Sequence, residues 1–212
     1  MAAGGTGSRE RYRTQVRAEI KQYAWEQIGT AGVSALSLNA IAKRVGMSGP
    51  ALYGYFANRD ELITELIRDA YRSLADAVRA AYDTGGDIAA VAQAIRAWAL
   101  ADPQRYFLLY GTPVPGYHAP EDTTAISNEV MTVLIAAFTA LSPETATPFD
   151  SHLETHRHWA PDAATPTTLR RALTFWTRLH GVLSLELAGH FTGMGFDPAL
   201  LFAEELSAFR AD

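Results

Sequence analysis

The sequence predicts an all-α protein in which a small three-helix head is joined by one long helix to a larger helical body. Three observations predict this class. Apolar residues recur at helical rather than alternating spacing almost throughout the 212 residues. Helix-capping residues precede the apolar stripes, and Gly or Pro separates one stripe from the next. We therefore expect roughly nine or ten helices and no sheet.

The head begins with a helix expected over residues 9–31. We interpret the basic start of the chain, MAAGGTGSRERYRTQVR (residues 1–17), as a flexible arm. Ser37 then caps a short helix that Gly46 ends, and Ser48 caps another that reaches about Tyr55. Two short capped helices separated by a tight glycine turn are typical of a helix-turn-helix.

The long connecting helix is expected from Arg59 to about Tyr82, because Asn58 and Glu61 have the spacing of a capping box. The body should then hold further helices over 88–101, 103–110, about 121–141, about 167–191 and about 198–210. This pattern predicts two domains, residues 1–58 and 59–212.

Two segments of the body are expected to lack long helices. Residues 111–120 form a loop rich in Pro and Gly. Residues 142–166 contain four prolines and should be irregular, apart from one helical turn around His152–Trp159.

Charge is distributed unevenly along the chain. Residues 1–60 carry eight Lys/Arg against four Asp/Glu, a net charge of +4, whereas the other 152 residues carry ten basic and 19 acidic groups, a net charge of −9. A basic head on an acidic body is the distribution expected when one end of a protein meets a polyanion such as DNA. Chance clustering of surface charge is the alternative explanation.

The second helix of the predicted helix-turn-helix leaves small residues and tyrosines on its exposed face. Such a helix can enter a DNA major groove without collision, and Ser48, Tyr53 and Tyr55 can donate hydrogen bonds to phosphates. Leu38, Leu52 and Phe56 instead suit the small core between the helices.

The stretch LNAIAKRVGMSGPALYGYFANRDELI, Leu38–Ile63, resembles the tetracycline-repressor-like (TetR-type) transcriptional regulators, and the resemblance extends over about residues 16–66. The family places a helix-turn-helix head on a helical domain for ligand binding and dimerisation. The resemblance implies that these residues bind DNA: Ser37, Tyr53, Tyr55 and Arg59 at the phosphate backbone, and Ser48, Gly49, Pro50 and Ala51 at base edges.

The recognition positions depart from the family pattern in one respect. Gly49 and Ala51 stand where many members carry a longer polar side chain or Thr. We therefore expect few hydrogen bonds to bases from this helix. Operator choice is expected to rest on Asn39, Lys43, methyl contacts from Ala51, the basic arm and DNA deformability.

The body is rich in aromatic residues that flank the Pro/Gly loop. FWTRLHGVLSLELAGHF (Phe175–Phe191) and YFLLYGTPVPGYHAP (Tyr106–Pro120) resemble a TetR subgroup whose effector domain has a Trp-x3-His-Gly helix. Aromatic side chains on several helices can line an apolar ligand pocket, although ordinary core packing explains them as well. The candidate ligand-binding residues are Trp98, Tyr106, Tyr110, Tyr117, Phe138, Trp176 and His180.

The two C-terminal helices are the candidates for a homodimer interface. Small residues there permit close approach of a partner helix, and leucines supply apolar surface. The candidate interface residues are Leu183, Leu187, Gly189, Leu201 and Phe209.

Several other functions find no support in the sequence. The absence of cysteine excludes disulfides and thiol catalysis and fits the cytoplasm. No apolar run is long enough to span a membrane, and no glycine-rich phosphate loop is present. His152, His156 and His158 lack a convincing set of further ligands, so we expect no metal, no cofactor and no enzyme activity.

The sequence therefore predicts a cytoplasmic homodimeric repressor that leaves a palindromic double-stranded operator when a small apolar or aromatic ligand binds. Two alternatives stay open at this point. One is a helical small-molecule-binding protein or enzyme whose head is an interaction module. The other is a DNA-binding regulator that responds to no effector.

Overall fold

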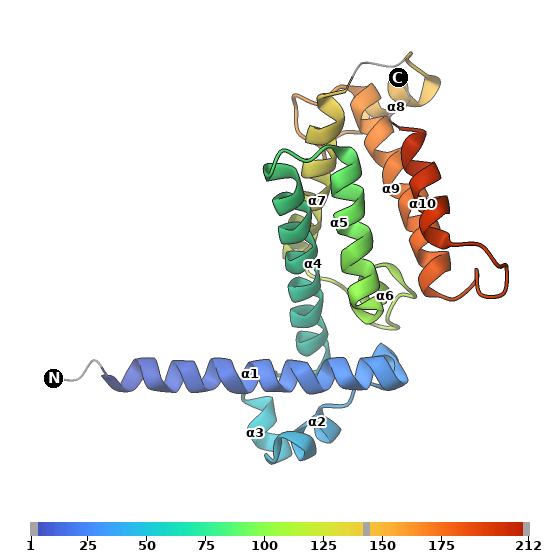
Figure 1. The fold of residues 1–212 in the computed structure, drawn as a ribbon. Helices are drawn as coiled ribbons and strands as arrows, with labels where there is room; N and C mark the ends of the chain where they lie inside the picture. Colours follow the sequence, from blue (N-terminus) through green and yellow to red (C-terminus); the bar gives the residue numbers. More distant parts are fainter. Residues whose placement is uncertain (1–3, 142–144, 210–212) are drawn as a thin grey trace.

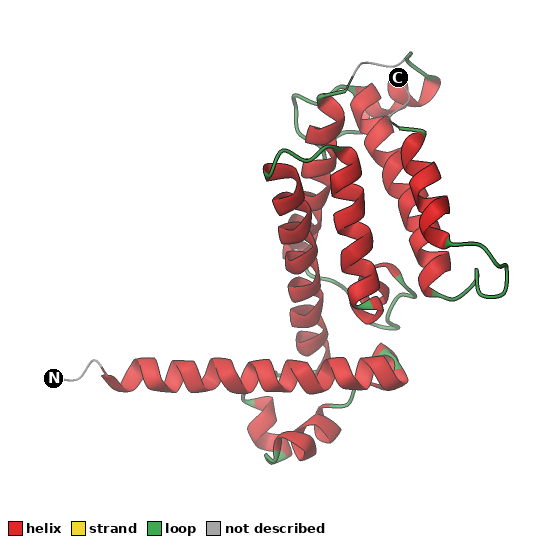
Figure 2. Ribbon diagram, in the orientation of Figure 1, coloured by secondary structure: helices red, strands yellow, loops and turns green. Residues whose placement is uncertain are grey.

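A computed structural model describes residues 4–141 and 145–209 of the chain. Over these residues the secondary structure consists of α-helices and one short 3-10 helix, with no strand (Figure 2). The prediction of an all-α protein is thus confirmed. The α-helices are α1 (Gly4–Ala31), α2 (Leu38–Val45), α3 (Gly49–Tyr53), α4 (Arg59–Asp83), α5 (Ile88–Ala101), α6 (Pro103–Tyr110), α7 (Glu121–Thr139), α8 (Pro148–Thr155), α9 (Pro166–Leu187) and α10 (Pro198–Ser207).

The helices are arranged in two bodies that share α4 (Figure 1). Helix α1 lies across the foot of α4, and α2 and α3 lie on the side of α1 away from the body. Helices α5 and α7 pack against α4, α9 packs against α5 and α7, and α10 packs against α9. The short α6 lies at the foot of this bundle, where it contacts α4, α5 and α1.

The three caps expected in the head are all present. The Ser37 hydroxyl accepts a hydrogen bond from the backbone N–H of Ala40, and the Ser48 hydroxyl accepts one from Ala51. The Asn58 side chain accepts from the backbone N–H of Glu61 over 2.8 Å at the start of α4. Because each cap satisfies a donor that the first helical turn leaves unpaired, these residues determine where the helices begin.

Gly46 makes the tight turn of the helix-turn-helix possible. Its φ of 78° lies in the left-handed region, which other L-residues reach only with strain. The backbone N–H of Gly46 also bonds to the carbonyl of Ala42, which ends α2. The second helix after this turn, α3, has only five residues and is shorter than predicted.

Two buried clusters correspond to the head and the body. The head cluster joins α1, α2 and α3 to the lower part of α4, which contributes Leu62, Ile63, Leu66 and Ile67. The body cluster begins at Leu74 of α4 and gathers side chains from α5, α7, α9 and α10. Since α4 belongs to both cores, a shift of this helix relative to the body would carry the head with it.

The structure corrects several predicted helix ends. Helix α1 begins at Gly4 instead of residue 9, so most of the segment interpreted as a flexible arm is helical. Helix α9 ends at Leu187 instead of 191, because the chain turns at Gly189 with a φ of 77°. A two-turn helix occupies residues 148–155, whereas the sequence predicted one turn around 152–159.

Two predicted boundaries involve residues outside the described part of the chain. Residues 142–144 of the expected irregular segment lie outside the described residues, as does residue 210 at the expected end of the last helix. Among the described residues, no helix is both long enough and apolar enough to cross a membrane.

Candidate DNA-binding surface and effector cavity

The exposed face of α3 consists of small and aromatic residues. Pro50, Ala51 and Tyr53 are exposed, with 48% of the Tyr53 side chain accessible, while Leu52 is fully buried and fixes the helix to the head core. No charged residue lies on this helix. Helix α3 can therefore contribute its shape, methyl contacts and the Tyr53 hydroxyl to binding at a DNA groove.

Asn39 approaches α3 at the position that lacks a side chain. A Cβ added to Gly49 would lie 3.4 Å from Oδ1 of Asn39, which places this amide beside position 49. Asn39 is exposed at the start of α2, and Lys43 is exposed one turn further along the same helix. Among the described residues Lys43 has no hydrogen-bonding or ion-pair partner, which leaves its charge available to a phosphate.

Most other basic residues of the head are used inside the protein. Arg13 donates to the carbonyl of Gly54 over 3.0 Å, and Arg17 donates to the carbonyl of Tyr55 over 2.6 Å. The Arg17 guanidinium also lies 4.2 Å from the centre of the Phe56 ring. These two arginines hold the chain directly after α3, a positioning role that sequence reasoning missed although their i,i+4 spacing on one helix face was visible.

Arg17 also pairs with Glu65 of α4 over 3.3 Å. Burial alone would raise the pKa of the Glu65 carboxyl, but hydrogen bonds from Arg68 and Arg17 and their charges hold it below its usual value. The carboxylate therefore stays ionised and ties α1 to the foot of α4.

The remaining predicted DNA-binding residues lie at the edges of the same surface. Ser37 is half-buried at the start of α2, and its backbone N–H donates to Gln27 over 3.0 Å. Tyr55 is half-buried, with the Arg13 guanidinium 5.5 Å from its ring centre. Arg59 donates to the carbonyl of Val33 over 2.8 Å, so part of its hydrogen-bonding capacity fixes the segment after α1.

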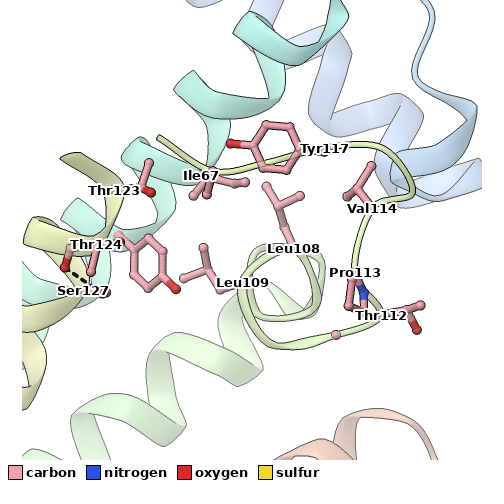
Figure 3. A pocket seen from close by; sticks show the side chains of 13 residues that line it. Ile67, Leu108, Leu109, Thr112, Pro113, Val114, Tyr117, Thr123, Thr124 and Ser127 are labelled. Atoms are coloured by element: carbon pink, nitrogen blue, oxygen red, sulfur yellow. Dashed lines mark hydrogen bonds between the residues drawn. The ribbon is translucent and has the colours of Figure 1, made fainter. Parts of the chain in front are cut away.

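A cavity of about 320 Å³ lies where the head meets the body (Figure 3). Its walls come from α4, α6, the loop of residues 111–120 and the start of α7. Ile67, Leu108, Leu109 and Val114 supply apolar surface in this view, and Ser127 lies on the opposite side from Val114. The volume lies at the lower end of the range of small-molecule sites, roughly 300 to 1,000 Å³.

The loop that walls the cavity is also attached to the head. The Tyr117 hydroxyl is hydrogen-bonded to the Thr64 hydroxyl over 3.0 Å, and Thr64 is buried on α4. Tyr117 and Val114 pack against the head cluster. Tyr117 is therefore in contact with the cavity and with the helix that supports the DNA-binding head.

Four of the predicted ligand-binding residues form an aromatic cluster behind the cavity. The rings of Tyr106, Tyr110, Trp176 and His180 lie 4.0–5.6 Å apart. Tyr71, which lines the cavity, meets Tyr110 edge to face at 6.3 Å. Tyr71 therefore connects the cavity with the aromatic cluster.

His180 lies at the centre of this cluster with one ring nitrogen unpaired. Its Nδ1 is hydrogen-bonded to the Tyr106 hydroxyl over 2.9 Å, and Tyr106 also pairs with Ser184 over 2.7 Å. Nε2 is buried with no hydrogen-bond partner among the described residues. Burial lowers the pKa of His180 to about 4, so the imidazole is neutral at physiological pH.

The structure does not bring the other predicted ligand-binding residues together at the cavity. Of the seven, Tyr117 is the one that lines it. Trp98 donates to the Ser73 hydroxyl over 2.9 Å, and Phe138 is buried against Phe175 and Phe209. The cavity residues Ile67, Leu108 and Leu109 were not predicted because in the sequence they belong to apolar stripes that suit a core equally well.

A groove of about 470 Å³, lined mainly by apolar residues together with the ion-paired Arg178 and Glu205, runs between α9 and α10. Leu201 lines it, with Gly181 and Leu185 on the facing helix, and Leu187 and Gly189 follow near the end of α9. Leu185 is 43% exposed and Leu200 of α10 is 70% exposed.

Two of the predicted interface residues are buried in the core of their own chain. Leu183 is fully buried on α9, and the Phe209 ring packs against Phe138 and Phe175. The apolar surface available to a second copy is therefore carried by the other three predicted residues and their exposed neighbours.

The histidines of residues 152–158 do not form a metal site in the described structure. The rings of His152 and His156 stack with centres 4.0 Å apart, and Nδ1 of His156 is hydrogen-bonded to the carbonyl of His152. Within the described ranges, no three His, Asp or Glu side chains are placed to hold one ion.

Comparison with known protein families gives matches over both parts of the chain. Residues 21–66 match the family described as bacterial regulatory proteins, tetR family. Residues 88–209 match the C-terminal domain described as tetracyclin repressor-like. The first match covers the helix-turn-helix and the second covers α5 to α10.

Similar proteins extend over almost the whole chain. HTH-type transcriptional regulators of Mycobacterium bovis and Mycobacterium tuberculosis are each 37% identical over 215 residues, which covers 92% of this chain and 91% of theirs. The crystal structure of SCO4313, described as a regulatory protein, is 67% identical, with a TM-score of 0.92 over 96% of this chain and 98% of that one. A tetR family regulator from Shewanella sp. PV-4 has the same fold at 16% identity, with a TM-score of 0.58 over 91% of this chain and 95% of that one.

Proposed function

The chain belongs to the TetR family of bacterial regulatory proteins, and from that premise we propose that it is a homodimeric repressor released from a palindromic operator by a small ligand. It is a DNA-binding transcriptional regulator and not an enzyme, since its relatives over nearly full length are regulators. We place its action in the cytoplasm, where the operator DNA is found.

The proposed operator contacts are those of the exposed head surface. Ser48, Gly49, Pro50 and Ala51 lie at base edges in the major groove, and Tyr53 of α3 contacts the phosphate backbone beside it. Asn39 and Lys43 of α2 flank them, and Ser37, Tyr55 and Arg59 meet the phosphate backbone. The exposure of Ser48, Pro50, Ala51 and Tyr53 and the free charge of Lys43 support this arrangement.

The proposed dimer forms through α9 and α10. The exposed leucines at positions 185 and 200, together with Leu187, Gly189 and Leu201, give each copy an apolar face that a two-fold axis would cover. Such a dimer presents two heads to two operator half-sites, so the operator is expected to be palindromic.

The effector site that we propose is the cavity of about 320 Å³. One observation carries this proposal: Tyr117 lines the cavity and is hydrogen-bonded to Thr64 of α4. A ligand that displaces Tyr117 breaks the contact between the body loop and the helix that carries the head. The ligand binds more tightly to a conformer in which the separation of the two heads does not match the operator half-sites. It therefore shifts the population towards that conformer, which binds the operator more weakly.

We further propose that the effector domain belongs to the subgroup with a Trp-x3-His-Gly helix. Trp176, His180 and Gly181 form the Trp-x3-His-Gly pattern on α9, and the first two side chains lie in the aromatic cluster behind the cavity. We propose that this cluster lies behind the effector site and supports Tyr71, whose ring meets Tyr110 and lines the cavity. The domain boundary proposed at residues 58/59 then separates the DNA-binding segment from the helix that transmits the signal.

Gel shifts with DNA that flanks the protein's own gene test the function. The wild type should bind at low salt, and Lys43→Ala should bind more weakly on every bound sequence, with the salt slope reduced by about one. No shift at low salt would contradict the repressor. A regulator without an effector would bind DNA equally well whatever small molecule is added, and would show no ligand binding in the cavity.

A further inference from the structure

The chemical character of the cavity between α4, α6 and α7 restricts the ligands that can occupy it. The inference rests on the proposed function in taking this cavity as the effector site. It goes beyond that function because it specifies the charge and the hydrogen-bonding groups of the ligand.

The walls of the cavity carry no ionised group. Its thirteen lining residues, all within the described part of the chain, include no Asp, Glu, Lys, Arg or His. The acidic groups among them are the hydroxyls of Tyr71 and Tyr117, and burial raises the pKa of Tyr71 above its usual value. A charged ligand would therefore lose part of its hydration without meeting an opposite charge.

Two hydroxyls of the cavity wall already donate their protons to backbone carbonyls, so towards a ligand they act as hydrogen-bond acceptors. The Thr123 hydroxyl donates to the carbonyl of Pro120 over 2.6 Å, and the Ser127 hydroxyl donates to the carbonyl of Thr124 over 2.9 Å. A hydroxyl has one proton and two lone pairs, so each can still accept a hydrogen bond. The group on a ligand that complements these two hydroxyls is a donor, either O–H or N–H.

The other walls suit an apolar body. Ile67, Leu108, Leu109 and Val114 face this space, with Pro113 beside them (Figure 3). A volume of about 320 Å³ favours a molecule of one or two rings.

We propose that the cavity binds an uncharged small molecule with an apolar body of one or two rings and at least one hydroxyl or N–H group, which donates to Ser127 or Thr123. The apolar side chains cover the body of the ligand, and the polar edge of α7 orients its donor. Anionic and cationic analogues of the same shape are excluded by their desolvation cost.

Four naphthalene compounds of matched shape provide the test, each titrated into the full-length protein at pH 7.5 without DNA. They are 1-naphthol, 1-methoxynaphthalene, 1-naphthoate and 1-naphthylmethylammonium. We expect 1-naphthol to bind tightest. The methyl ether, which lacks the donor, should bind about fivefold more weakly, and the two ions at least about tenfold more weakly.

A pair of variants locates the binding. Ser127→Leu fills the cavity and should weaken 1-naphthol binding at least about tenfold. Asn128→Leu makes a similar apolar change at the next residue, which is exposed and does not line the cavity, and should leave binding unchanged. Thermal unfolding shows whether each variant is folded, and the four-compound series on the wild type needs no variant.

Equal or tighter binding of either ion, unchanged binding by a folded Ser127→Leu protein, or no binding of any of the four compounds would overturn the inference. These results are independent of the gel shift. A protein that binds its operator but fails this series keeps its proposed repressor role and loses the ligand class. A protein that passes the series but binds no DNA loses the repressor role instead.

Discussion

Tyr53 and Tyr117 are two tyrosines whose hydroxyl groups lie in different environments. The Tyr53 side chain is 48% exposed on the proposed DNA-binding face. The Tyr117 hydroxyl is hydrogen-bonded to buried Thr64 where the body meets the head. Removing one hydroxyl at a time therefore separates DNA contact from internal coupling.

Tyr117→Phe should lower the free energy of unfolding by about 1–2 kcal/mol, because the Thr64 hydroxyl loses a partner in a buried position. Tyr53→Phe should leave that free energy within about 0.5 kcal/mol and weaken operator binding about fivefold. Urea unfolding and gel shifts on both variants check this. Equal stability of the two variants would show that the Tyr117–Thr64 bond does not hold the loop.

His180 should make the stability of the protein depend on pH. Its pKa is about 4 in the folded protein, and an unfolded histidine has a pKa of about 6.5. Below pH 6.5 the unfolded chain takes up a proton that the folded chain does not, so the free energy of unfolding falls as the pH decreases towards 4. The loss over this interval is about 3 kcal/mol.

A His180→Gln variant isolates this contribution. The wild type should lose about 3 kcal/mol more than the variant between pH 6.5 and 4, measured by urea unfolding at each pH. Carboxylates such as Asp150 and Glu65, whose pKa values are also lowered, are present in both proteins and cancel in the comparison. The same pH dependence in both proteins would mean that His180 is not buried as a neutral group.

At the scale of the elements, glycines at two positions should respond to substitution in opposite directions. Gly46→Ala introduces a Cβ at a φ of 78° in the helix-turn-helix and should cost about 1–2 kcal/mol of stability. Gly29→Ala lies inside α1, where the new Cβ meets the nearest atom at 3.8 Å, and should stabilise by about 0.5–1 kcal/mol. Thermal unfolding of the pair checks the sign, and stabilisation by Gly46→Ala would contradict the turn.

Local signals predicted the elements of the head well. Ser37, Ser48 and Asn58 cap helices where the sequence placed caps, and Gly46 ends α2, because caps and left-handed turns depend on a few neighbouring residues. Helix α9 was predicted too long because the apolar pattern continues past Gly189, where the backbone turns. Sequence periodicity contains no signal for that φ angle.

The cavity could not be predicted in the same way. Its walls combine Ile67 of α4, Leu109 of α6 and Ser127 of α7, which tertiary packing alone brings together. Aromatic content predicted instead the cluster of Tyr106, Tyr110, Trp176 and His180, which packs behind the cavity. Of the features predicted to form the ligand site, the Pro/Gly loop does lie at the cavity, which its residue Tyr117 lines.

At the scale of the whole molecule, the proposed mechanism depends on two copies joined through α9 and α10. Leu200→Arg places a charge at the 70% exposed position of α10 and should give the mass of one chain in light scattering at micromolar concentration. Leu100→Arg makes the same change at a 39% exposed position of α5 and should leave the dimer intact. A dimer that survives Leu200→Arg would place the interface elsewhere.

The two heads of a dimer give the central claim a geometrical consequence. Each head presents α3 to one half-site, and the two-fold axis repeats that contact about one helical turn of DNA away or somewhat further. Footprinting of the protein on the DNA that flanks its own gene, combined with the mass of the complex, measures this directly. We predict protection with two-fold symmetry over a palindrome, with two chains for each pair of half-sites. Unsymmetrical protection by a single chain, or no protection at low salt, would contradict it.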